Sequence, residues 1–261
     1  FVSVTDQAGF PIKDLASEDF TLQENGVPVA NPAANPIGEN DTIALSMLMD
    51  FSGSIIDAAG AVENMEEAAK ILVGAMRATD EADIIKYADV FKAMTPDGFT
   101  SDKTVLEAAI EEDPGLGRGT ALYDTTVAAI ARAESSDTAP ETARTVVINL
   151  TDGEDRNSQT DLDATINDAL DTDIPVFTVG FGEVDPDVLQ QLADATGGLF
   201  YSPAADANLQ GVSDQLVSLL FNDQYVITFD SALGDAESAS LEVAVGGLLD
   251  GEGSKTILAC Q

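Results

Sequence analysis

Apolar runs and amphipathic helical patterns alternate through the middle of this chain. Residues 43–50 are apolar almost throughout, and residues 144–150 contain the β-branched core Val146-Val147-Ile148, so both predict buried strands. Further strand patterns cover residues 83–92, 174–180 and 199–201, and helical patterns cover residues 58–78, 103–112, 121–134, 162–170, 186–196 and 207–221. Strands that alternate with helices of this length indicate an α/β fold: a doubly wound, mostly parallel central sheet with helices on both faces.

The two ends of the chain differ from this middle. Residues 20–23 lead into Asn25-Gly26, which is typical of a tight turn between two strands, and three strand-like runs without a helical pattern lie in residues 223–261. Isolated short hairpins are only marginally stable in water. We therefore expect residues 1–40 and 223–261 to pair as one small, split β-sandwich-like module, with the α/β domain at residues 41–222.

The charge balance excludes several classes of function. Eleven basic residues stand against 47 acidic ones, which gives a net charge of −36 at pH 7. Such a surface repels nucleic acid and anionic lipid, and it favours cations, basic partners or a high-salt, for example marine, environment. Because the chain has no histidine, Ser-His-Asp and Cys-His catalysis and the usual zinc ligand sets are also excluded.

The cysteine content and the termini add further expectations. Cys260 is the only cysteine, so its thiol can pair only with another chain. No apolar run approaches the roughly 18 residues of a membrane span, so we expect no membrane insertion. The sequence begins at Phe1 rather than at a methionine, which suggests a processed mature protein or a fragment.

Oxygen-bearing side chains gather where the predicted strands end. Asp50, Ser52 and Ser54 follow the first apolar run, Asp152 follows the run at residues 144–150, and a glycine-rich loop between them presents Thr120. Ligands of open α/β sheets bind beyond the carboxyl ends of the strands. Two carboxylates, three hydroxyls and water make a six-oxygen shell suited to a hard divalent cation, which would also offset the repulsion between the two aspartates.

Each of these pieces also has a purely structural interpretation. Ser52 or Ser54 would cap the helix that follows them, and Thr120 would cap the helix predicted at residues 121–134. Asp152 and the glycine after it form a common turn. The three pieces together, two of them directly after buried strands, favour the metal site.

Two further acidic segments have simpler interpretations. Asp155, Asn157 and Ser158 could shape the rim of the site or hold a second cation, but we interpret them as a solvated loop. The acidic run at residues 161–173 is interpreted as a charged outer helix face, because the EF-hand spacing with its glycine and closing glutamate is absent.

Several motifs resemble the von Willebrand factor A (vWA) family, which includes the inserted domains of integrins. The motifs are DFSGS at residues 50–54, GTALYD at 119–124, LTDGED at 150–155, IPVFTVGFG at 174–182 and LADATGG at 192–198. The resemblance covers about residues 41–222, and the flanks are similar to those of bacterial secreted vWA proteins. In this family the first three motifs form the metal-ion-dependent adhesion site (MIDAS). The resemblance implies that the metal ligands are Asp50, Ser52, Ser54, Thr120 and Asp152, with Mg²⁺ or Ca²⁺ as the ion and Mn²⁺ as a further candidate.

The resemblance implies an extracellular or cell-surface adhesion module in which the divalent cation recruits an Asp or Glu carboxylate of a protein partner. An alternative is a structural surface or filament subunit that assembles with copies of itself through its β flanks. We do not expect an enzyme. Phosphatases of the haloacid dehalogenase type need Asp-x-Asp where this chain has Ser52, and neither a Gly-x-x-x-x-Gly-Lys loop nor a Gly-x-Ser-x-Gly elbow is present.

Overall fold

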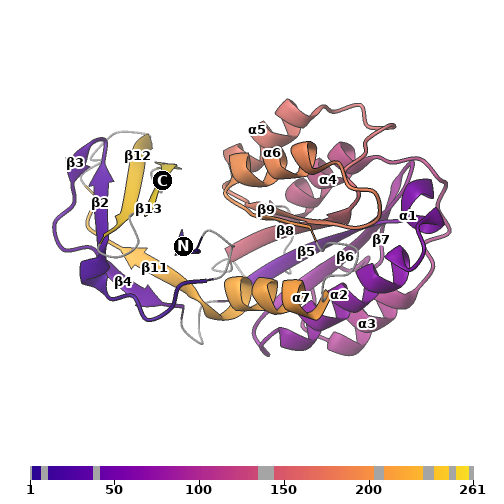
Figure 1. The fold of residues 1–261 in the computed structure, drawn as a ribbon, viewed down its shortest axis with the longest axis horizontal. Coiled ribbons are helices and arrows are strands. Elements are labelled where there is room, and N and C mark those ends of the chain that lie inside the picture. The colour runs from indigo at the N-terminus through magenta and orange to yellow at the C-terminus, as the bar shows by residue number, and fades with distance from the viewer. Residues whose placement is uncertain are drawn as a thin grey trace. The chain divides into compact units, whose positions relative to one another are not determined.

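The chain forms two compact units (Figure 1). The computed structural model describes residues 2–6, 11–37, 42–134, 144–202, 209–231, 238–246 and 251–258. One unit comprises residues 39–217, and the other combines residues 1–38 with residues 218–261. In the part of the chain so described, no helix has the length and apolar character needed to cross a membrane.

The larger unit contains a six-stranded sheet in the order β10-β9-β8-β5-β6-β7. These strands are β5 (Ile43–Asp50), β6 (Glu81–Tyr87), β7 (Phe91–Ala93), β8 (Arg144–Thr151), β9 (Val176–Gly180) and β10 (Phe200–Tyr201). All neighbouring pairs are parallel except β6 and β7. All eight residues of β5 are buried, which is expected for a central parallel strand covered on both faces.

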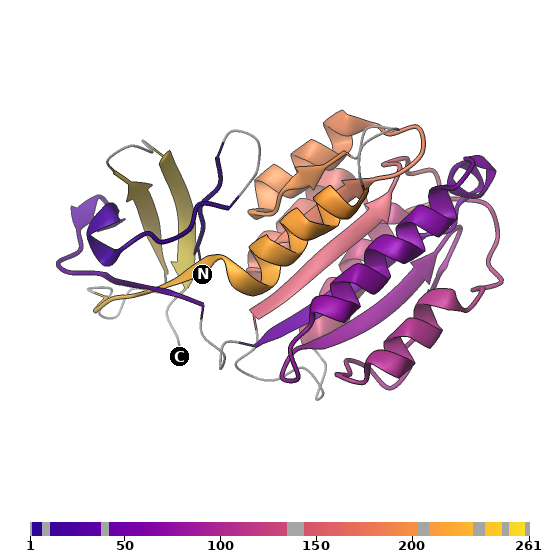
Figure 2. The same cartoon turned by 60° about the horizontal axis from the view of Figure 1, so that its bottom comes forward.

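Helices cover both faces of this sheet, as Figures 1 and 2 show, so the predicted fold class is confirmed. One face carries α2 (Ala61–Ala75), α3 (Lys103–Glu111) and α7 (Leu209–Val217), and the other carries α4 (Leu122–Glu134), α5 (Leu162–Thr172) and α6 (Pro186–Thr196). The predicted helix at residues 58–78 is shorter and is preceded by a separate turn of helix, α1 (Gly53–Asp57). Gly60 separates the two with a φ of +76°, a conformation that glycine adopts without strain.

The strand predicted at residues 83–92 is an antiparallel hairpin of β6 and β7. Two charged residues of β6 are fully buried, which obscured the apolar pattern. The Asp83 carboxylate accepts a hydrogen bond from Arg132 Nε at 2.6 Å, and Lys86 Nζ donates to the backbone carbonyls of Ile110 and Glu112 at the end of α3. Burial lowers the pKa of Lys86 to about 8.

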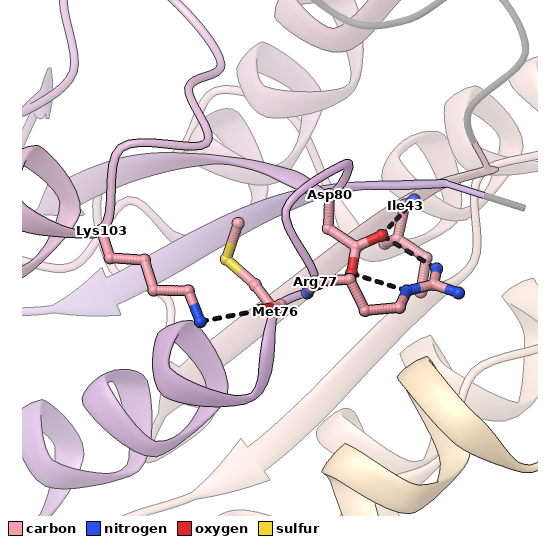
Figure 3. Close-up of polar contacts among 5 residues, drawn as sticks. All are labelled: Ile43, Met76, Arg77, Asp80 and Lys103. Atoms are coloured by element: carbon pink, nitrogen blue, oxygen red, sulfur yellow. Dashed lines mark hydrogen bonds and ion pairs between the residues drawn. The ribbon is translucent and has the colours of Figure 1, made fainter. Parts of the chain in front are cut away.

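A buried aspartate organises the turn between α2 and β6 (Figure 3). Asp80 is fully buried, and its carboxylate accepts hydrogen bonds from the backbone and guanidinium of Arg77 and from the backbone N–H of Ile43. The donor–acceptor distances lie between 2.7 and 3.1 Å. The contact joins the end of α2 to the start of the central strand β5, so it fixes where that helix lies on the sheet.

We expect Lys103→Met to lower the free energy of unfolding by about 1 kcal/mol, because Lys103 Nζ hydrogen-bonds the last carbonyls of α2. It donates to Gly74 O and Met76 O at 2.7 Å each (Figure 3 shows the second contact). Urea unfolding measures the change. The control is Lys70→Met, whose surface ion pair with Glu111 is screened by water and should contribute little to stability. Equal effects of the two substitutions would contradict the capping role.

The smaller unit combines strands from both ends of the chain. One sheet has the order β1-β11-β4 and the other the order β13-β12-β2-β3. The strands are β1 (Val2–Ser3), β2 (Phe20–Glu24), β3 (Val27–Pro28), β4 (Ala33–Pro36), β11 (Gln224–Thr228), β12 (Ser238–Val245) and β13 (Gly251–Leu258). Phe20 of one sheet and Tyr225 of the other pack with ring centroids 5.1 Å apart in a small shared core. The predicted intermolecular thiol, Cys260, lies outside the described residues.

Candidate metal centre

The two predicted aspartate ligands lie at the same edge of the central sheet. Asp50 is the last residue of β5, and Asp152 directly follows β8. These strands are parallel neighbours, with Met49 opposite Leu150, so both chains leave the sheet side by side. This register is the reason why two residues about a hundred positions apart in sequence can share one site.

Asp50 is a buried carboxylate held by uncharged donors. It is 0% exposed, and its two oxygens accept hydrogen bonds from the backbone N–H of Ser52 and the hydroxyl of Thr151, each at 2.7 Å. The pKa of Asp50 is raised to about 7: burial is the main cause, the charge of the nearby Asp152 adds to it, and the hydrogen bonds oppose the shift. In the described chain no lysine or arginine pairs with this carboxylate, so its negative charge is uncompensated.

Asp152 and the two serines lie next to Asp50. Asp152 is 1% exposed, and burial raises the pKa of its carboxyl group, whereas a hydrogen bond from the Ser54 side chain opposes that rise. The hydroxyls of Ser52 and Ser54 lie 3.1 Å apart. Ser52 occupies the N-cap position of α1 but its side chain makes no capping hydrogen bond, so the structural interpretation of this serine as a cap is wrong.

The glycine-rich loop brings Thr120 to the other two loops through its backbone. Thr120 is 2% exposed; its N–H donates to the side-chain oxygen of Asn157 at 2.9 Å, and its carbonyl accepts from the N–H groups of Arg156 and Asn157. Among the described residues, no hydrogen bond joins the Thr120 hydroxyl to the other four predicted ligands. The structure therefore places Asp50, Ser52, Ser54 and Asp152 close enough for hydrogen bonds or electrostatic interactions with one another. It holds the fifth predicted ligand, Thr120, on an adjoining loop.

The described residues contain no group of three or more carboxylate, histidine or cysteine side chains placed to bind a metal ion. The site is built instead from two carboxylates and neighbouring hydroxyls, which is oxygen chemistry that suits Mg²⁺, Ca²⁺ or Mn²⁺. Two buried acids with raised pKa values and no cationic partner fit a divalent cation, because such an ion would offset both the burial and the mutual repulsion.

Residues 155–160 are exposed or partly buried, as a solvated loop should be, but their polar groups also anchor the loop to the protein. The Asp155 carboxylate accepts hydrogen bonds from Tyr123 N at 3.0 Å and from the Ser158 hydroxyl at 2.6 Å, and Asp124 accepts from the backbone of the same loop. These oxygens are therefore occupied by protein donors, which does not favour a second cation. These hydrogen bonds attach the Asp152 loop to the start of α4, and Thr120 lies just before the first residue of that helix.

Two residues that sequence reasoning did not assign as supports of the site contribute to it: Thr151 was missed, and Asn157 was named at the rim but interpreted as part of a solvated loop. Thr151 orients Asp50 from the neighbouring strand, and Asn157 links the Asp152 loop to Thr120. Thr151 is the last residue of a buried strand and directly precedes Asp152. This position is the sequence signal that could have identified Thr151. For Asn157 the signal was its proximity to the motif, because its contact depends on how two distant loops meet.

We expect Asn157→Ala to weaken divalent-cation binding by about tenfold, since residues that position metal ligands typically contribute ten- to a hundredfold. The substitution removes the acceptor of the Thr120 N–H and frees that loop. Isothermal titration calorimetry with Mg²⁺ or Mn²⁺ measures the change. Gln159→Ala is the matched control, because it is in the same loop but hydrogen-bonds there through its backbone. Unchanged affinity in Asn157→Ala would contradict the positioning role.

The described architecture, a doubly wound sheet with a carboxylate and hydroxyl cluster beyond its carboxyl edge, defines an α/β protein with a candidate cation site. Residues 45–215, well over half of the chain, match the family model of the von Willebrand factor type A domain. The chain belongs to this family. A search of curated proteins found no match.

Solved structures show the same fold at low sequence identity. A von Willebrand factor type A protein from Catenulispora acidiphila is 15% identical with a TM-score of 0.61, and the match covers 95% of this chain and 75% of that one. Proximal thread matrix protein 1 from the mussel byssus, with a zinc-occupied MIDAS motif, is 18% identical with a TM-score of 0.58, covering 77% and 50%. BatB from Bacteroides thetaiotaomicron is 18% identical with a TM-score of 0.54, covering 68% and 98%.

Proposed function

We propose that this protein is a metal-dependent protein-binding module. Asp50, Ser52, Ser54, Thr120 and Asp152 hold a divalent cation, and an Asp or Glu carboxylate of a protein partner completes its oxygen shell. The bound cation supplies a positive charge that an incoming carboxylate can bind directly. The module needs no catalytic group for this task, and we propose that it is not an enzyme.

The observation that carries the proposal is the pair of buried aspartates. Asp50 and Asp152 are almost fully shielded from water, burial raises the pKa of both, and the charge of Asp152 raises that of Asp50, yet no basic side chain in the described chain neutralises them. Burying two like charges without compensation is strongly unfavourable. A divalent cation would offset that penalty, so the two buried aspartates are better explained by cation binding than by a role in folding alone.

The ligand chemistry favours Mg²⁺, Ca²⁺ or Mn²⁺ over zinc. All five side chains offer oxygen, and hard cations prefer oxygen ligands, whereas protein zinc sites rely on histidine and cysteine. The mussel byssus protein contains zinc in its MIDAS motif, so a vWA fold can accommodate that ion in such a site. Competition between Mg²⁺, Ca²⁺, Mn²⁺ and Zn²⁺ at equal concentrations would order the four ions for this chain.

Paired peptides test the partner chemistry. We expect the full chain to bind arrayed peptides that carry a glutamate or aspartate. It should bind poorly to the matched peptides in which that residue is replaced by glutamine or asparagine. Binding should disappear in EDTA and in Asp50→Ala, and it should persist in Asp168→Ala, an exposed aspartate on α5. Binding that is equal with Mg²⁺ and with EDTA would contradict the proposal. Metal-dependent phosphate-ester hydrolysis abolished by Asp50→Asn would contradict the non-enzymatic assignment.

We also propose an extracellular or cell-surface location. The net charge of −36 suits a high-salt medium, and the mussel relative is a thread matrix protein. Fractionation of the native host, with detection of the chain in the medium or on the cell surface, tests the location. Recovery in the cytoplasmic fraction alone would contradict it.

The smaller unit favours a second candidate, a structural subunit that assembles through its β strands. Its two described sheets end in the strands β1, β4, β3 and β13, and Val27 of β3 is largely exposed. Edge strands can pair with strands of another copy. Ordered polymers seen by electron microscopy in high salt would support this function, and a strictly monomeric species in sedimentation at high concentration would contradict it.

A further inference from the structure

The arginines of this acidic protein are distributed unevenly. The chain has five, and all lie in the described part. Arg77 and Arg132 bind the buried carboxylates of Asp80 and Asp83, and Arg144 lies close enough to Arg77 and Asp80 for their charges to affect its pKa. The remaining two, Arg118 and Arg156, have side chains that are 57% and 69% exposed, and both are on the loops of the candidate metal centre.

Arg118 lies against the loop that carries the two serines. Its Nη2 is 2.5 Å from a carboxylate oxygen of Asp57 and 3.3 Å from the carbonyl of Gly53. A Cβ placed on Gly53 would be 3.2 Å from Nε and from Nη2, so the guanidinium lies directly over that glycine. Because Gly53 stands between Ser52 and Ser54, this positive charge is next to two of the predicted metal ligands.

Arg156 is joined to the other two loops. Its backbone N–H donates to Thr120 O at 3.0 Å, and its Nη2 is 2.5 Å from a carboxylate oxygen of Glu154. Glu154 in turn donates its N–H to Asp152 at 3.1 Å. The second exposed arginine is therefore fixed through its backbone between the loops that carry Thr120 and Asp152.

Both guanidinium groups remain able to bind an incoming anion. Each described contact uses one terminal nitrogen of a group that has five N–H donors. The side chains of the intrachain partners, Asp57 and Glu154, are 72% and 38% exposed, and ion pairs that water reaches stabilise a protein only weakly. A carboxylate from another protein can replace them and gain the bidentate geometry that arginine offers.

We propose that the partner is an acidic protein segment, in which the carboxylate that binds the cation is followed or preceded by further carboxylates that pair with Arg118 and Arg156. This inference rests on the proposed function of the same site. The net charge of −36 repels an acidic segment from most of the protein surface. The two arginines and the cation attract the acidic segment to one place on the surface. They therefore determine where a partner binds and which kind of partner is bound.

The test compares two short synthetic peptides by fluorescence anisotropy with the full chain in Mg²⁺. One peptide carries a single glutamate among serines and glycines, and the other carries additional glutamates on both sides of it. We expect the acidic peptide to bind about tenfold more tightly at low salt, with a preference that shrinks as salt rises. In Arg118→Gln/Arg156→Gln the preference should vanish, and in Lys70→Gln, which removes a partly exposed lysine of α2, it should remain.

Further arms make the outcome decisive. Glu154→Gln removes the intrachain competitor of Arg156 and should increase the preference for the acidic peptide. Mn²⁺ binding by the double arginine variant, followed by electron paramagnetic resonance, should be at least as tight as in the unaltered chain because two nearby positive charges are gone; this verifies that the loops keep their fold. An unaltered preference in that variant, or stronger binding of a uronic-acid oligosaccharide than of either peptide, would overturn the inference.

The failure of the inference is distinguishable from the failure of the proposed function. Equal, Mg²⁺-dependent binding of both peptides would leave the metal-dependent function intact and overturn the role of the arginines. An arginine-dependent preference that persists in EDTA would support the acidic partner and contradict the role of the cation.

Discussion

Asp50→Ala is expected to weaken divalent-cation binding by at least about 100-fold. The substitution removes one of the two carboxylates among the proposed ligands and leaves three hydroxyls and Asp152. Isothermal titration calorimetry measures the affinity directly. Asp50→Asn should behave similarly, because it keeps the shape of the side chain and removes its charge.

Thermal unfolding provides an independent measure of the same substitution. A ligand at a hundred times its dissociation constant stabilises the folded state by about 2.7 kcal/mol, and both Asp50 variants should lose this stabilisation. Asp168→Ala removes an exposed aspartate of α5 and should respond to Mg²⁺ like the unaltered chain. Equal metal-induced stabilisation of Asp50→Ala and the unaltered chain would remove Asp50 from the site.

Asp80→Ala is expected to lower the free energy of unfolding by about 3–5 kcal/mol, the range observed when one partner of a buried ion pair is removed. The substitution removes the carboxylate that accepts hydrogen bonds from the Arg77 guanidinium and from the buried Ile43 N–H (Figure 3). Urea unfolding, followed by circular dichroism, measures the change.

Two comparisons sharpen the Asp80 prediction. Asp168→Ala should stay within about 0.5 kcal/mol of the unaltered chain, as exposed substitutions usually do. The double substitution Arg77→Met/Asp80→Leu should recover part of the loss, because it removes the buried carboxylate and its partly buried guanidinium partner together. A loss below about 1 kcal/mol in Asp80→Ala would show that this contact does not hold α2 to the sheet.

The central strands of the fold could be predicted because the apolar residues of each strand are enough to indicate that the strand is buried. Every residue of β5 is buried, and its sequence is apolar almost throughout. The hairpin of β6 and β7 was less accessible to prediction, because Asp83 and Lys86 are buried yet charged. Their partners, Arg132 and the carbonyls at the end of α3, are distant in sequence, so no local pattern reveals that these charges belong to the interior.

The candidate site was predictable for a related reason. Asp50 and Asp152 each directly follow a buried apolar run, so two strand ends marked them without knowledge of the strand order. Thr151 and Asn157 could not be assigned in the same way. Their contacts require that β8 lies beside β5 and that the loops of Thr120 and Asp152 meet, which are properties of the folded chain.

The decisive test of the proposed cation site is a crystal structure of the full chain grown with Mn²⁺, with anomalous diffraction used to locate the ion. We expect one strong anomalous peak beyond the carboxyl ends of β5 and β8. Ser52 and Ser54 should bind the ion, and Asp50, Thr120 and Asp152 should be linked to it directly or through water, with metal–oxygen distances of about 2.0–2.6 Å. A Mn²⁺ peak at another place on the chain, with these five side chains left without an ion, would contradict it.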